Sequence, residues 1–171
     1  MSPPWLTTEE IQNYGLWLQS GAIVVSLLGV LVGVTITTGV NRKIARRRAT
    51  LDLIMAQQSN DFLIRSRHDF IVLREAGNLV QWAVVDSVVT AQQTTLRAAI
   101  NRYELIAIGI KQKTLDGSVY KSYARSGVIR DWLACKPWVM QMRQTYSTPA
   151  YYCEFEKLAK KWATREERKH C

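Results

Sequence analysis

The first 41 residues of the chain have almost no charge, and Glu9 and Glu10 are the only acidic or basic side chains among them. Residues 16–40 are dominated by Leu, Ile, Val, Gly and Ala. A helix of these 25 residues, at about 1.5 Å per residue, is longer than the roughly 30 Å of a bilayer's hydrocarbon core. We therefore predict one transmembrane helix over 16–40, after a short external segment, 1–15. A buried helix of a soluble protein is disfavoured, because such helices are shorter and usually carry a polar face.

A block of five cations follows this run directly: Arg42, Lys43, Arg46, Arg47 and Arg48. A cleaved signal peptide is disfavoured, because the N-terminus is acidic and the apolar run ends in arginines instead of a small-residue cleavage site. Lys and Arg beside a spanning helix stay on the cytoplasmic side. We therefore expect a cell (inner) membrane protein with its N-terminus outside and residues 42–171 in the cytoplasm. The cations of this basic juxtamembrane segment, 41–48, would contact anionic lipid, each contributing about 1 kcal/mol.

The predicted span contains a GxxxG motif at Gly29 and Gly33, and Ala22, Ser26 and Thr37 extend the same face at nearly helical spacing. Small residues let two helix backbones approach closely in lipid, where packing drives association. The motif is weakly specific, because glycine is common in membrane helices. It makes a homo-oligomer through the transmembrane helix one of two open alternatives, beside a monomer.

Histidine and cysteine are scarce: the chain has His68 and His170, and Cys135, Cys153 and Cys171. Cysteines that follow the membrane helix would lie in the reducing cytosol, so disulfides are not expected. Their spacing fits no zinc pattern. The sequence also lacks the GxxxxGK[ST], GxGxxG, HExxH and GxSxG motifs. We predict no metal, no cofactor and no assignable catalytic residue, which makes an enzyme the less favoured class.

Beyond the cations, apolar residues recur every three or four positions, which is typical of amphipathic helices. We predict a helical cytoplasmic domain over 49–165 and a solvated tail over 166–171, so the fold class is all-α: a single N-terminal transmembrane helix followed by a helical bundle. Only residues 84–89, VVDSVV, suit a strand as well. The predicted core contains Leu96, Ile100, Tyr103, Ala107, Ile110, Trp132, Phe155, Leu158 and Trp162.

Cap residues and helix breakers mark the boundaries within this domain. Asn60 and Thr90 are favourable N-cap residues, and Thr90 opens a Thr-x-x-Gln capping box. Thr148, followed by proline, predicts the start of the last long helix. Gly127 and Pro137 are expected to interrupt or kink the helix between them.

Three stretches of the chain are distinctive: RRRATLDLI, NRYELIAIGIKQKTLDGSVYKSYARSGVIRDW and FEKLAKKW, with Pro137 between the last two. They resemble a bacterial family catalogued as domain of unknown function 4760. The most specific pieces are Glu104–Ile110 and Arg130–Trp132. The resemblance runs from about Leu16 to Trp162 and implies an N-terminal membrane helix with a helical cytoplasmic region. It implies no activity and no catalytic residues.

Glu104 lies one turn after Ile100 on the apolar face of its predicted helix. A buried carboxylate needs a cationic or hydrogen-bonding partner. We predict that Arg125 or Arg130 provides it, in a buried ion-pair network that also includes Asp131. A catalytic role for Glu104 is disfavoured, because a second acid, a metal-ligand set and a nucleophile are missing from its neighbourhood.

Three functions remain open. The favoured one is a protein-interaction, scaffold or effector module at the cytoplasmic membrane face, with an unidentified protein partner or a second copy of itself. The second is a membrane-tethered hydrolase acting on nucleotide or nucleic acid through Glu104, Asp131 and nearby arginines. The third is nucleic-acid binding, which the net charge of +9 permits. We disfavour it because much of that charge lies beside the predicted membrane helix. Its basic face would comprise Lys157, Lys160, Lys161, Arg165, Arg168 and Lys169.

Overall fold

The structure is a computed structural model that describes residues 8–83 and 89–171, with side chains from residue 17 onward. Helices are the only regular elements in these ranges, which confirms the all-α prediction. In chain order they are α1 (Thr8–Ser59), α2 (Asp61–Glu75), the 3-10 helix η1 (Leu79–Ala83), α3 (Ala91–Lys111), α4 (Gly117–Thr145), α5 (Cys153–Trp162) and α6 (Glu167–His170).

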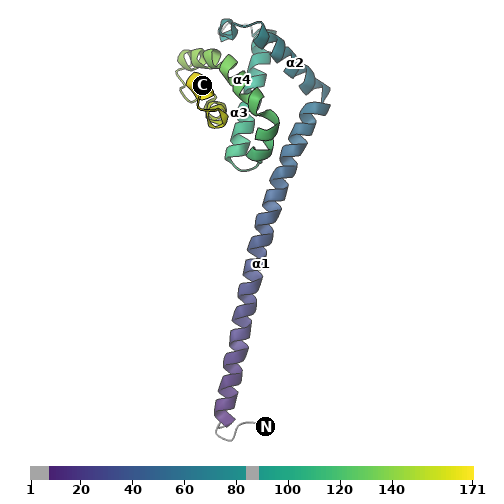
Figure 1. The fold of residues 1–171 in the computed structure, drawn as a ribbon, viewed down its shortest axis with the longest axis vertical. Coiled ribbons are helices and arrows are strands. Elements are labelled where there is room, and N and C mark those ends of the chain that lie inside the picture. Colours follow the sequence, from purple (N-terminus) through teal and green to yellow (C-terminus); the bar gives the residue numbers. More distant parts are fainter. Residues whose placement is uncertain (1–7, 84–88) are drawn as a thin grey trace. The chain divides into compact units, whose positions relative to one another are not determined.

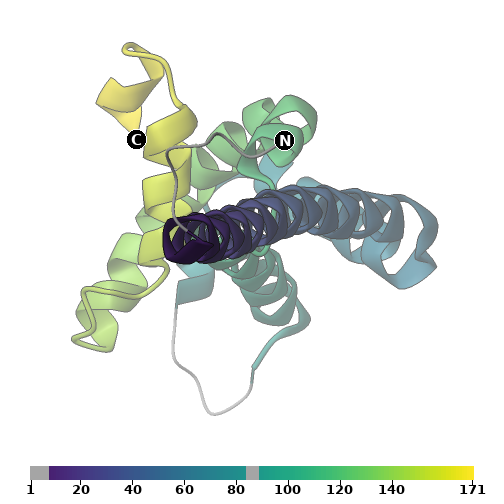
Figure 2. The same cartoon turned by 90° about the horizontal axis from the view of Figure 1, so that it is seen from below.

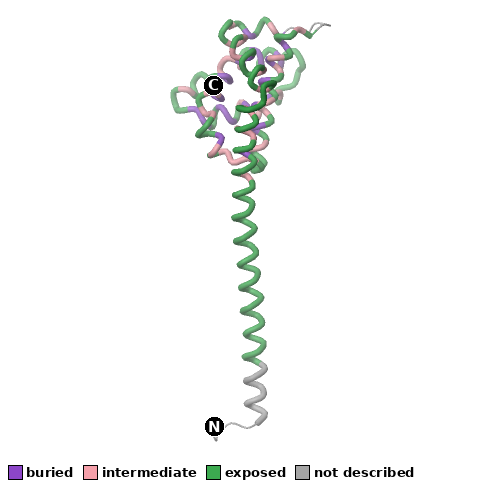
Figure 3. Tube along the Cα trace, turned by 90° about the vertical axis from the view of Figure 1, so that its right-hand side faces the viewer, coloured by how far each residue is buried: buried purple, intermediate pink, exposed green. Residues whose placement is uncertain are grey.

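The chain divides into two compact units, Met1–Ile44 and Ala45–Cys171. In the first unit, every side chain from residue 17 to residue 44 is exposed (Figure 3). The helix that contains this stretch is the one helix in the described part of the chain that could cross a membrane by its length and composition. The predicted apolar span therefore forms a continuous helix.

The second unit is a helical bundle that starts at Ala45, inside the predicted basic segment. In Figure 1, α3 and α4 lie between α2 on one side and α5 on the other, and α3 contacts both of these outer helices. Figure 2 shows α5 and α6, in yellow, together at one side of the bundle. The helices therefore enclose a core to which α3 and α4 contribute most of the large side chains.

The predicted core is confirmed. Eight of its nine residues are buried, and Ile110 is half-buried against them. Tyr103 stacks on Phe155 with ring centroids 4.6 Å apart, and Trp132 meets the same Phe155 ring edge-on at 5.2 Å. Three further residues that were not predicted in the core are fully buried as well: Trp138, Val139 and Met142.

Two predicted N-caps are also confirmed. The Asn60 side chain accepts a hydrogen bond from the backbone N–H of Leu63 at 3.2 Å. The Thr90 side chain accepts one from the N–H of Gln93, whose own side chain accepts one from the Thr90 N–H. Both caps are formed by residues three positions apart, so the local sequence is sufficient to predict them.

Gly127 and Pro137 do not divide the chain into separate helices, because α4 runs through both. A proline inside a helix removes one hydrogen bond and its ring crowds the preceding turn. Burial of Trp138, Val139 and Met142 in the core keeps the last turns of α4 helical despite this cost. Figure 1 shows that these last turns run in a different direction from the first turns of α4.

The predicted start of the last long helix after Thr148 is wrong. Residues 149–152 form turns, and α5 begins at Cys153. Tyr152 precedes it in a left-handed conformation with φ of 55°, and its side chain forms no capping hydrogen bond. The residue that caps α5 comes from another helix and is described below.

Four of the six residues of the predicted solvated tail, 166–171, are exposed, but Glu167 and Cys171 contact the bundle. The Glu167 carboxylate accepts a hydrogen bond from the Thr164 N–H at 2.7 Å, and the Thr164 hydroxyl accepts one from the Glu167 N–H at 3.2 Å. These reciprocal bonds have the pattern of a capping box. Cys171 is buried, and its carbonyl accepts a hydrogen bond from the Trp132 indole at 3.4 Å. Residues 166–171 are therefore part of the bundle.

Most of the VVDSVV stretch lies outside the described residues, since 84–88 are not among them. The chain before it forms η1, which buries Leu79 and Ala83. Gly77 and Asn78, which separate α2 from η1, have positive φ angles of 74° and 51°. Glycine and asparagine tolerate this left-handed region best, which suits the turn that follows the end of α2.

Candidate functional site

The most buried charge of the bundle belongs to Asp131 of α4, whose side chain is 1% exposed. One carboxylate oxygen accepts a hydrogen bond from the Arg74 guanidinium of α2 at 2.5 Å, and the other accepts one from the Tyr103 hydroxyl of α3 at 2.5 Å. A charge removed from water needs such partners, because an unpaired buried carboxylate would cost several kcal/mol. Asp131 therefore joins three helices through polar contacts.

Arg67 of α2 continues this cluster at its outer side. Its guanidinium donates a hydrogen bond to the Tyr103 hydroxyl oxygen at 3.4 Å. Burial, and then the negative charge of Asp131, raise the pKa of Tyr103 well above its usual value. The phenol is therefore protonated at physiological pH, and its proton lies in the bond to Asp131.

The structure corrects the partner that was predicted for Glu104. Its two carboxylate oxygens accept hydrogen bonds from the backbone N–H groups of Glu154 and Phe155, at 3.2 and 2.7 Å. These N–H groups belong to the first turn of α5, where helix donors lack partners within the helix and the dipole favours a negative charge. Glu104 is thus the cap of a helix 50 residues away in sequence.

The two arginines that were predicted to pair with Glu104 have other partners. Arg125 donates to the Trp162 carbonyl at 3.1 Å and to the Glu167 carboxylate at 2.6 Å, which fastens the end of α5 to α4. Arg130 lies 3.7 Å from the Asp131 carboxylate, and its side chain is 61% exposed. The predicted network therefore divides into separate contacts, of which only the one around Asp131 is deeply buried.

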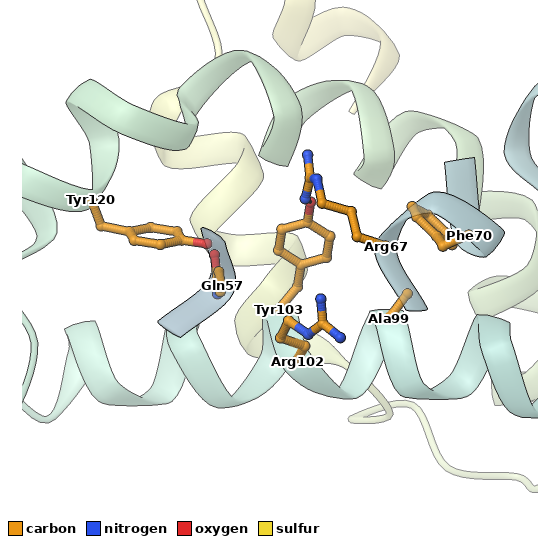
Figure 4. A pocket seen from close by; sticks show the side chains of 7 residues that line it. All are labelled: Gln57, Arg67, Phe70, Ala99, Arg102, Tyr103 and Tyr120. Carbon is orange, nitrogen blue, oxygen red and sulfur yellow. The ribbon is translucent and has the colours of Figure 1, made fainter. Parts of the chain in front are cut away.

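An open cavity of about 300 Å³ lies beside the Asp131 cluster, between the end of α1 and helices α2, α3 and α4. Its lining includes two arginines, three tyrosines and two glutamines, and no acidic residue. A narrow cleft of about 10 Å³, enough for one water molecule, adjoins it and shares four of its residues (Figure 4). Those four are Gln57, Arg67, Tyr103 and Tyr120.

The sequence analysis missed this cavity, because its residues come from four helices. Figure 4 shows the Tyr120 hydroxyl directed at Gln57, and the Arg67 guanidinium above the Tyr103 hydroxyl. The arginine and tyrosine residues of the site lie in three separate segments of the sequence, so they form no local motif. The one available signal was Arg130-Asp131 beside the predicted core, which the sequence pattern linked to Glu104 instead.

The basic juxtamembrane segment makes contacts of its own. Arg47 lies 3.4 Å from the Asp116 carboxylate, and its side chain is 53% exposed. Thr50, which is fully buried, accepts a hydrogen bond from the Asp116 N–H at 2.8 Å. Asp116 also caps α4 by accepting from the N–H groups of Ser118 and Val119. The start of the second unit is thereby fixed to the loop before α4, and a lipid role for the five cations remains a prediction.

In the predicted association motif, a Cβ added at Gly29 or Gly33 would meet no atom of the described chain within 4 Å. Both positions are exposed. The small-residue face is therefore available to a second helix, and self-association stays a prediction.

The scarce histidines and cysteines form no cluster in the described ranges, where no three His, Cys, Asp or Glu side chains could share a metal ion. His68 lies 3.9 Å from Asp69, and both side chains are well exposed. Cys135 is fully buried, and this burial raises the pKa of its thiol. Cys153 is only half-buried.

Comparison with known proteins places the chain in one family. No curated protein and no solved structure matches it. A family model matches residues 17–162, which include the apolar helix, the Asp131 cluster, Glu104 and the cavity. The chain therefore belongs to the family described as Domain of unknown function (DUF4760).

Proposed function

We propose that this protein is anchored in the cell (inner) membrane by one helix, with its N-terminus outside and residues 42–171 in the cytoplasm as an interaction module. The observation that carries the proposal is that the apolar stretch is exposed, whereas the second unit has a buried core of its own. The apolar side chains of residues 17–40 are all exposed. The buried core consists of residues of the second unit alone.

Exposure of so many apolar side chains to water would be very unfavourable. Burying one Val, Leu or Ile side chain is worth about 1.5–3 kcal/mol, and a bilayer offers that burial to the whole stretch. Thr35 and Thr37 fit such a medium, because their hydroxyls donate to the carbonyls of Val32 and Gly33 at 2.8 Å. The stretch therefore suits lipid around its whole circumference.

The orientation rests on the one-sided charge. Five cations follow the span within seven positions, whereas the residues before it carry only Glu9 and Glu10. Positive charge beside a spanning helix is retained in the cytoplasm. In this orientation the whole second unit lies in the cytoplasm.

A binding role suits the second unit better than acid–base catalysis. Asp131 is held between Arg74 and Tyr103, and both oxygens of Glu104 accept backbone hydrogen bonds. Neither carboxylate is available to a substrate without breaking a structural contact. On the basic C-terminal face, Lys157 and Lys160 pair with acidic neighbours on α5, which weakens its suitability for nucleic acid. A scaffold or effector that contacts a protein partner is the role these features favour.

Paired fusions test the proposal. The full chain is expressed in bacteria with a C-terminal alkaline phosphatase, active only outside the inner membrane, or with a fluorescent protein that matures only inside. We expect fluorescence and no phosphatase activity. Changing the five cations to glutamine should make the orientation mixed, while changing Lys157, Lys160, Lys161, Arg168 and Lys169 to glutamine should leave it unchanged. Phosphatase activity from the unaltered chain would contradict the proposal.

A further inference from the structure

We infer that the cavity beside Asp131 is a binding site for a phosphate monoester group. Its walls carry hydrogen-bond donors and positive charge from several helices, without an acidic side chain among the lining residues. The site lies entirely within the second unit, so it is independent of the membrane anchor.

The positive charge around the cavity exceeds the negative charge. Arg67 and Arg130 line it, and Arg74 lies behind them. Two carboxylates contact Arg74: Asp131 at 2.5 Å and the exposed Glu75 at 3.2 Å, so Arg74 compensates the charge of Asp131. Arg130 is farther from it, at 3.7 Å, and Arg67 reaches it only through the Tyr103 hydroxyl. Two guanidiniums therefore face the cavity with little compensation, which favours an anion there.

Tyr123 adds a neutral donor to the cavity, whereas the Tyr103 hydroxyl donates to Asp131. The Tyr123 hydroxyl oxygen accepts a hydrogen bond from the Gln58 amide at 2.6 Å, which leaves its own proton free to donate. Tyr120, which also lines the cavity, is hydrogen-bonded to Gln57 (Figure 4). The arrangement offers donors from α1, α2 and α4 around one space. An acceptor with several oxygens would satisfy more of them than a single carbonyl could.

The Arg67 guanidinium lies close to the α4 backbone at one wall of the cavity. Gly127 of α4 lines the cavity, and a Cβ added there would lie 3.7 Å from a terminal nitrogen of Arg67. The guanidinium thus lies against a helix surface without a side chain. The volume of about 300 Å³ is at the lower end of the range for small-molecule sites, which suits a phosphate with a small substituent.

A phosphate monoester could come from a soluble metabolite or from a lipid headgroup. Both present the same terminal group, with two ionisable oxygens and a third acceptor. The recognition chemistry described above is common to them. The experiment therefore uses one arm for each source.

In the soluble arm, the full chain in neutral detergent micelles is titrated with glycerol 3-phosphate by calorimetry, at constant ionic strength. In the lipid arm, the chain in nanodiscs of phosphatidylcholine is compared with nanodiscs that also contain phosphatidic acid, and protection of the second unit is followed by hydrogen exchange. We expect saturable binding in the first arm, or protection of the α2 and α4 residues around the cavity in the second. The first result identifies a metabolite, and the second alone identifies a headgroup.

Three variants locate the binding. Arg130→Gln should weaken it about tenfold, or about 1.4 kcal/mol, without unfolding the bundle, because the Arg130 side chain is mostly exposed. Tyr123→Phe should weaken it about threefold. Lys121→Gln removes the same charge from an exposed position of α4 outside the cavity and should leave binding unchanged. The inference is wrong if neither arm shows binding, or if Arg130→Gln and Lys121→Gln have equal effects.

Discussion

The apolar stretch of α1 and helix α3 are helical segments of comparable length, but they differ in how far their side chains are buried. In α3 one stripe is buried, through Leu96, Ile100 and Tyr103, while Leu105 on the outer face is 69% exposed. In residues 17–40 no side chain is buried, although most of these residues are apolar. A helix with a polar face buries its apolar face in a protein core, whereas one that is apolar all round needs a lipid environment.

The two regions differ in how they use charge as well. Residues 17–41 contain no acidic or basic side chain. The bundle instead buries Asp131 and uses Glu104 and Asp116 as helix caps. Charge is thus part of the tertiary structure in one region and is excluded from the other. Variants that remove a ring or a charge should therefore affect stability only in the bundle.

The largest effect is expected from a core tryptophan. Trp132 is fully buried against Phe155, so Trp132→Ala should lower the free energy of unfolding of the bundle by about 3–5 kcal/mol. Trp17 is 78% exposed in the apolar stretch, and Trp17→Ala is the matched control. Thermal unfolding of the full chain in detergent should show a large shift for the first variant and almost none for the second. Equal shifts in the unfolding temperature of the two variants would contradict the difference in burial between the two regions.

Loss of the buried carboxylate should have a similar or slightly smaller effect. Asp131→Asn leaves Arg74 without its buried counter-ion and with only the exposed Glu75 as an ionic partner, at a cost of about 3 kcal/mol. The double variant Asp131→Asn with Arg74→Met should cost less than the two single changes added together, because no unpaired charge remains. Urea unfolding of the four proteins gives this coupling energy. Additive effects would show that Arg74 and Asp131 do not stabilise each other.

A moderate effect is expected at the cap of α5. Glu104→Gln keeps one acceptor oxygen but loses the charge and the second bond, so it should cost about 1–2 kcal/mol. Combination with Arg125→Gln should be additive, because Arg125 contacts Glu167 and the Trp162 carbonyl instead. A double-mutant cycle by thermal unfolding checks this. Strong coupling between the two positions would instead support the ion pair between Glu104 and Arg125 that was predicted from the sequence.

The smallest effect is expected at Asp116. Hydrogen bonds from the Ser118 hydroxyl and from backbone N–H groups lower the pKa of Asp116 to about 2, against 3.8 for an unfolded chain. Its contribution to stability is therefore complete above about pH 4 and is lost as the pH falls toward 2. Asp116→Asn retains a cap but cannot titrate, so the unfolding curves of the two proteins should differ above pH 4 and converge near pH 2. Curves that stay parallel over this range would refute this prediction.

Local interactions could be predicted from the sequence, and interactions between distant segments could not. The caps at Asn60 and Thr90 involve residues three positions apart, and the stripe through Ile100 repeats at helical spacing. The cap of α5 comes from Glu104, which no pattern near Tyr152 indicates. Asp131 was recognised as part of a buried network, but its partner Arg74 lies 57 residues away on α2. The predictions that were wrong are therefore those that depend on tertiary contacts between distant segments.

Pro137 shows that tertiary contacts also decide whether a helix breaker ends a helix. Its effect on an isolated helix is to end or kink it. In the bundle, the fully buried Trp138 and Met142 beyond it stabilise the helical turns that the proline weakens. The cavity was missed for a related reason, since Gln57, Arg67 and Arg130 approach one another only after the helices pack.

Protease protection tests the anchored topology most directly. Trypsin cleaves after Lys and Arg, which are absent from residues 1–41 and frequent from Arg42 onward. The account predicts that trypsin outside intact spheroplasts leaves the whole chain uncut. In inverted membrane vesicles, it should remove the second unit and leave a membrane-bound N-terminal fragment that ends within residues 42–48. Cleavage of the second unit in intact spheroplasts, or loss of the uncut chain from the membrane in an alkaline wash, would contradict the account.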